Sequence, residues 1–65
     1  MTKFERVKLE LENKTRNTDN FITLTKNVDA RHKGKYVIQN VFTRNTSNVS
    51  YKTLDEVINE FELKI

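Results

Sequence analysis

The side chains of this sequence that are best suited to chemistry are cations. They occupy the middle and late polar segments of the chain: Lys26, Arg31, Lys33, Lys35, Arg44 and Lys52. Mobile cations on loops and strand ends can contact the phosphates of a nucleic acid, and such contacts supply much of the affinity in these complexes. These six side chains, together with the ring of Tyr36, therefore form a predicted nucleic-acid-binding surface.

The aromatic side chains near these cations admit two interpretations. Tyr36, Phe42 and Tyr51 could offer rings on which unpaired bases stack, if they lie on an open face of a sheet. Aromatic side chains of strands are more often packed in a core, so burial is the competing interpretation. The sequence leaves open whether the nucleic acid would be single- or double-stranded.

Charge is distributed unevenly along the chain. Residues 1–53 carry eleven Lys or Arg against five Asp or Glu, whereas residues 54–65 carry one lysine against four acids. This asymmetry predicts an electropositive sheet side and an electronegative helix side. An ordinary solvated surface of mixed charge is the competing interpretation.

Several kinds of site are disfavoured by composition. There is one histidine, His32, in a basic polar stretch, and there is no cysteine. Nucleophilic catalysis needs a base beside the nucleophile, and structural zinc sites need several Cys or His ligands. The one glycine, Gly34, excludes a glycine-rich phosphate loop. We therefore expect no enzymatic activity, no catalytic residue, no metal and no cofactor.

Length and composition predict one small domain over residues 1–65. A chain of 65 residues is near the size at which a hydrophobic core is barely sufficient. With 35% hydrophobic residues and no tryptophan, we expect a core of about a dozen side chains. Homodimerisation is one way for so short a chain to bury more surface.

The cellular compartment is predicted from what the sequence does not contain. No N-terminal segment resembles a secretory signal, and no apolar run approaches the ~18 residues of a membrane span. We therefore expect a cytoplasmic protein without membrane contact. Asparagine, threonine and lysine are abundant, which is typical of AT-rich bacterial or phage genomes and suggests a phage or mobile element as the source.

An amphipathic helix is predicted at the C-terminus. Thr53 and Glu56 have the spacing of a capping box, in which Glu56 reaches back to the Thr53 amide. The apolar side chains that follow recur at helical spacing and form one stripe: Leu54, Val57, Ile58 and Phe61. Such a stripe needs a partner surface, which the preceding strands would supply.

Three strands are predicted before this helix, over residues 21–25, 36–43 and 49–51. They are rich in aromatic and β-branched residues and separated by polar connections. Gly34 is expected to supply a positive φ angle in the second connection. Which face of the sheet is buried stays open, because Tyr36, Ile38 and Phe42 compete with Val37 and Val41 for that position.

The first segment fits two periods. Val7, Leu9 and Leu11 alternate with charged residues, as in a half-buried strand, whereas Thr2 and Glu5 have capping-box spacing, as in a helix. A helix would place Leu9 on the side opposite to Val7 and Leu11, so a strand over residues 6–12 is the favoured interpretation. The fold class is then α+β: a three- to four-stranded antiparallel meander with one C-terminal helix on one face.

Two hypotheses of function follow. The first is a small non-enzymatic protein that binds nucleic acid through the basic sheet and loop surface. The second is a protein-interaction module, such as a phage or plasmid factor that binds and modulates a host protein. In that case an exposed sheet face or edge strand would add to a sheet of the partner.

Overall fold

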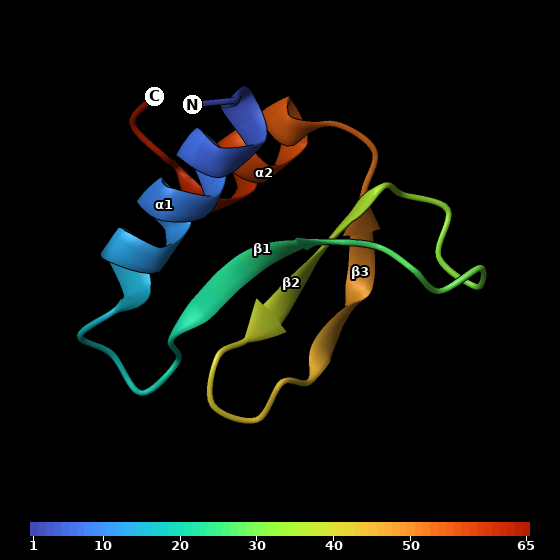
Figure 1. Ribbon diagram of the computed structural model, residues 1–65, viewed down its shortest axis with the longest axis horizontal. Helices are drawn as coiled ribbons and strands as arrows, with labels where there is room; N and C mark the ends of the chain where they lie inside the picture. The colour runs from blue at the N-terminus through green and yellow to red at the C-terminus, as the bar shows by residue number, and fades with distance from the viewer.

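A computed structural model describes all 65 residues and shows two layers. Three antiparallel strands form a sheet in the order β1-β2-β3, and both helices lie on the same face of it (Figure 1). The expected α+β class, with an antiparallel meander and a C-terminal helix, is confirmed at this level. The elements are α1 (Lys3–Thr15), β1 (Ile22–Lys26), β2 (Tyr36–Asn40), β3 (Thr46–Tyr51) and α2 (Leu54–Phe61).

The first segment is the helix α1, so the favoured strand over residues 6–12 is wrong. Both halves of the capping box form: the Glu5 amide donates to Thr2 Oγ1 over 3.2 Å, and the Thr2 amide donates to Glu5 Oε1 over 3.4 Å. Val7 and Leu11 are fully buried, while Leu9 is 38% exposed on the outer side. One leucine left on the surface is ordinary, and it does not outweigh a cap and a buried stripe.

The register of the sheet decides which face is buried. Leu24 pairs with Ile38, and Tyr36 pairs with Tyr51, and these side chains face the helices. Val37 lies on the opposite, open face, between Thr25 of β1 and a serine of β3. The alternative with Tyr36 and Ile38 on the helix side is therefore the observed one.

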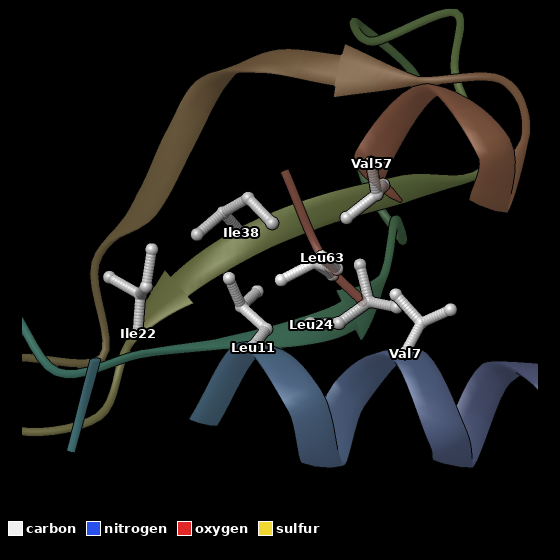
Figure 2. Packing of buried hydrophobic residues seen from close by; sticks show 7 residues of the cluster. All are labelled: Val7, Leu11, Ile22, Leu24, Ile38, Val57 and Leu63. Atoms are coloured by element: carbon white, nitrogen blue, oxygen red, sulfur yellow. The ribbon is translucent and has the colours of Figure 1, made fainter. Parts of the chain in front are cut away.

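The core lies between the sheet and the two helices. Side chains of Val7 and Leu11 point from α1 toward β1, and Val57 reaches the same space from α2 (Figure 2). Partly buried aromatic and aliphatic side chains pack around this cluster. Its buried members are Val7, Leu11, Ile22, Leu24, Ile38, Val57 and Leu63.

Helix α2 matches the prediction, with one difference at its start. Thr53 Oγ1 accepts a hydrogen bond from the Glu56 amide at 3.3 Å, as expected of the cap. The Glu56 carboxylate, however, accepts from the amide of Lys52 over 3.0 Å rather than from that of Thr53. This bond ties the β3–α2 connection to the first turn of the helix.

The end of α2 returns the chain to the core. Glu62 adopts a left-handed conformation with φ 53°, and the Leu63 amide donates to the Ile58 carbonyl over 3.0 Å. The left-handed residue and this bond are those of a Schellman motif, whose hydrophobic residue packs back onto the helix. Leu63 accordingly lies in the core, 9% exposed. No helix of this chain is long and apolar enough to cross a bilayer.

The second strand ends earlier than predicted, at Asn40 rather than residue 43. Asn40 Oδ1 accepts hydrogen bonds from the amides of Phe42 and Thr43, each at 2.9 Å. The Arg44 amide donates to the Asn40 carbonyl over 2.8 Å, and Arg44 has φ 63°. An asparagine side chain that bonds its own following backbone favours a turn over continued strand.

Gly34 does not have a positive φ angle, so that expectation is wrong. The glycine is required for close packing instead. A Cβ added there would lie 2.6 Å from the Tyr51 nitrogen and 2.8 Å from the Ser50 carbonyl carbon. The β1–β2 connection can approach β3 this closely only because Gly34 has no side chain.

Candidate nucleic-acid interface

Four exposed lysines lie at one end of the sheet. Lys26 closes β1 opposite the start of β2, and the Lys35 amide donates to the Tyr51 carbonyl over 2.9 Å, just before Lys52. Lys33 is in the connection between β1 and β2. We call this set the basic end, and it consists of Lys26, Lys33, Lys35 and Lys52.

The connection that carries Lys33 is held by hydrogen bonds and extends beyond the sheet (Figure 1). The Asn27 side-chain amide donates to the carbonyls of His32 and Gly34, at 3.2 and 2.8 Å. The Asp29 amide donates to Asn27 Oδ1 over 2.9 Å. The backbone of this connection, which carries Lys33 and Lys35, is therefore held in place by hydrogen bonds.

Arg31 lies in the same connection but its charge is already paired. Its guanidinium donates to both carboxylate oxygens of Asp29, with Nη2 at 2.9 Å from Oδ2. These hydrogen bonds from Arg31 lower the pKa of Asp29 to about 2, so the carboxylate is ionised at neutral pH. Of the predicted cations in this connection, Arg31 is therefore the least able to attract a phosphate.

Three acids on the elements next to the basic end have partners of their own. Glu5 is engaged in the cap of α1, and Asp55 binds Lys3 Nζ at 2.7 Å. Glu56 accepts from the backbone amide of Lys52. None of the four lysine ammonium groups takes part in an ion pair, because the chain's ion pairs are those of Lys3, Arg6 and Arg31. The positive charge of the basic end is thus left for solvent or a partner.

Tyr36 lies at the same end but faces the helices. Its ring packs against Phe4, with centroids 5.8 Å apart, and Lys26 Nζ lies 5.6 Å from the centroid of Phe4. Tyr51 likewise packs against Phe61 at 6.4 Å, and burial raises the pKa of its hydroxyl. Both tyrosines are therefore half-buried parts of the core margin rather than a stacking surface.

Arg44 is not near the other predicted cations. It follows β2, at the opposite end of the sheet, and β2 alone spans about 14 Å from Tyr36 to Asn40 at ~3.4 Å per residue. Phe42, two residues before Arg44 in the same turn, is 70% exposed. The alternating pattern of residues 36–43 had predicted a sheet face for Phe42. The Asn40 side chain was the signal that could have placed it in a turn.

The open face of the sheet carries hydroxyl, amide and aliphatic side chains, and Lys26 and Asp29 lie at its margin. Thr25, Val37 and Gln39 line a shallow pocket of about 200 Å³ there, which the β1–β2 connection overhangs with His32. Nowhere do three or more His, Cys, Asp or Glu side chains gather as metal ligands would. The neutral hydroxyl and amide groups of this face can accompany a bound backbone but cannot attract one by charge.

Comparison with protein-family models, with characterised proteins and with solved structures finds no match to this chain.

Proposed function

We propose that this protein is a small non-enzymatic nucleic-acid-binding protein that contacts phosphates through the basic end. The observation that carries the proposal is the gathering of Lys26, Lys33, Lys35 and Lys52 at one end of the sheet, exposed and free of ion pairs. The sequence distributes these lysines over 27 positions, and the strand pairing brings them together. A polyanion bound at this end would contact lysines that are far apart in the sequence.

The electrostatics of such binding can be quantified. Each phosphate that a lysine neutralises releases condensed counterions. The logarithm of the association constant therefore falls linearly with the logarithm of the salt concentration. For four contacts we expect slopes of about −3.6 on duplex DNA and about −2.8 on a single strand. A protein whose lysines were merely solvated would show neither slope.

The test is a fluorescence anisotropy titration of labelled single- and double-stranded 12-mers at several salt concentrations between 25 and 200 mM. We expect binding at the lowest salt that weakens steeply as salt is added. Absence of binding to every oligonucleotide at the lowest salt would contradict the proposal.

A second candidate function rests on the free edge of the sheet. The strand β3 has no neighbour on its outer side, carries no charged residue over Thr46–Tyr51, and leaves Val49 59% exposed. An uncharged edge can accept a strand from another protein. The register irregularity between β2 and β3 bends this edge and works against such pairing.

Nuclease treatment separates the two candidates. A protein partner of the edge should be captured from nuclease-treated lysate by the wild type and lost with Val49→Lys, which leaves the basic end intact. Capture that disappears on nuclease treatment would instead support the nucleic-acid proposal.

A further inference from the structure

An exposed aromatic ring lies at the end of the sheet opposite to the basic end. Phe42 is 70% exposed, and its ring meets that of Phe21 edge to face, with centroids 5.8 Å apart and an interplanar angle of 69°. We call this pair the aromatic corner, and it consists of Phe21 and Phe42. Exposure of an aromatic side chain to water is unfavourable in free energy, because its burial would remove a large apolar area from solvent.

The turn holds Phe42 in position. Asn40 Oδ1 accepts the Phe42 amide over 2.9 Å, and the Asn40 amide donates to the Asn45 carbonyl over 2.9 Å. The Val41 amide donates to the Phe21 carbonyl over 2.9 Å, which fixes the two aromatic residues relative to each other. The ring is therefore presented to solvent by an ordered backbone, so binding at it would require little ordering of the turn.

The chemistry around the aromatic corner favours a base attached to a phosphate. Arg44 follows Phe42 in the turn, and Arg16 lies in the connection that leads to Phe21. Both are exposed and neither forms an ion pair, although Asp19 is in the same connection. Stacking on an aromatic ring beside an arginine is how unpaired bases are held without sequence preference.

The size of the corner argues against a protein as its occupant. Besides the partly exposed Phe21, the apolar side chains open to solvent there are Phe42 and Val41, the latter only 37% exposed. A stable protein interface needs about 800 Å² on each partner, far more than these side chains provide. One ring matches the area of one base.

We propose that Phe42, supported by Phe21, stacks an unpaired base, so that the nucleic acid bound by this protein is single-stranded. This inference rests on the proposed function and specifies its substrate. Bases of a duplex are already stacked on each other and have no free face to offer. β2 alone spans about 14 Å between the two ends, and a 12-mer is longer than this even at the ~3.4 Å per nucleotide of a stacked strand, so one strand can reach both.

The experiment uses Phe42→Trp as a reporter, because the chain has no tryptophan. The probes are a thymidine 12-mer and an abasic 12-mer, which carry the same phosphates and differ only in their bases. We expect the thymidine strand to quench the fluorescence of this tryptophan and the abasic strand to leave it unchanged. We also expect Phe42→Ala to weaken thymidine 12-mer binding about 5- to 150-fold and abasic binding not at all.

Val49→Ala is the matched control, because it removes an exposed apolar side chain outside the aromatic corner. Thermal melts by circular dichroism confirm that each variant is folded. If the wild type binds both strands equally and Phe42→Ala changes neither affinity, the inference is overturned while the proposed function stands. If the wild type binds neither strand at low salt, both are overturned. A dimer that dissociates on Phe42→Ala would assign the corner to a second copy and overturn the inference.

Discussion

At the scale of single residues, Gly34 connects the fold to the candidate interface. It stands between Lys33 and Lys35, and its amide donates to Ser50 Oγ over 2.9 Å. At Gly34 the β1–β2 connection lies so close to the backbone of β3 that a residue with a Cβ atom would not fit. The two lysines are therefore positioned by a residue that has no charge of its own.

Gly34→Ala tests this role. The added methyl group would meet backbone atoms of Ser50 and Tyr51 closer than 3.0 Å, and backbone cannot move aside as a flexible side chain can. We expect a loss of about 1–3 kcal/mol in the free energy of unfolding, measured by urea denaturation. Asn48→Ala, at an exposed position of β3, is the control and should change stability by less than about 0.5 kcal/mol. Equal stabilities for the two variants would contradict the close-approach explanation.

At the scale of elements, α1 shows what periodicity can and cannot decide. Val7 and Leu11 belong both to an alternating pattern and to a helical stripe, so among these apolar residues only Leu9 distinguished the two. The structure leaves Leu9 partly in solvent and gains the cap of Thr2 and Glu5. A complete capping box was therefore a more reliable signal than the position of one leucine.

The two leucines of α1 provide a matched pair for testing the helix. Leu11→Ala removes a side chain with no exposed surface and should cost about 2–5 kcal/mol of unfolding free energy. Leu9→Ala removes a partly exposed side chain on the outer side and should cost less than about 1 kcal/mol. Chemical denaturation of both variants measures the difference. If Leu9→Ala were as damaging as Leu11→Ala, both leucines would be buried, as the strand interpretation requires.

Other elements show why part of the fold could be predicted and part could not. The stripe and cap of α2 are local signals, and local signals identified that helix correctly. The end of β2 depends on hydrogen bonds made by the side chain of Asn40. The aromatic and β-branched residues around Asn40 favoured a longer strand in the sequence pattern. The orientation of Tyr36 depends on its contact with Phe4, 32 positions away, which no single-segment pattern contains.

At the scale of the whole molecule, the acids of α2 share the helix layer with the cations of α1, which are Lys3, Arg6, Lys8 and Lys14. The outer positions of α2 carry the acids Asp55, Glu56 and Glu60, and the connections at the basic end carry lysines. Four of the six predicted cations lie at the basic end. Arg44 lies at the opposite end of the sheet, and Arg31 is paired with Asp29. Pairing between segments far apart in sequence decided which cations came together, and composition alone could not show it.

The most direct test of the basic end compares two double variants of identical net charge. Lys33→Ala with Lys35→Ala removes two of its four cations, whereas Lys8→Ala with Lys64→Ala removes two exposed cations elsewhere on the surface. The measurement is the salt dependence of affinity for a single-stranded 12-mer, by anisotropy. We expect the first variant to bind more weakly with a slope shallower by about 0.7 per lysine, and the second to keep the slope of the wild type. Equal losses in the two variants would show that only total charge matters, and would contradict a localised interface at this end of the sheet.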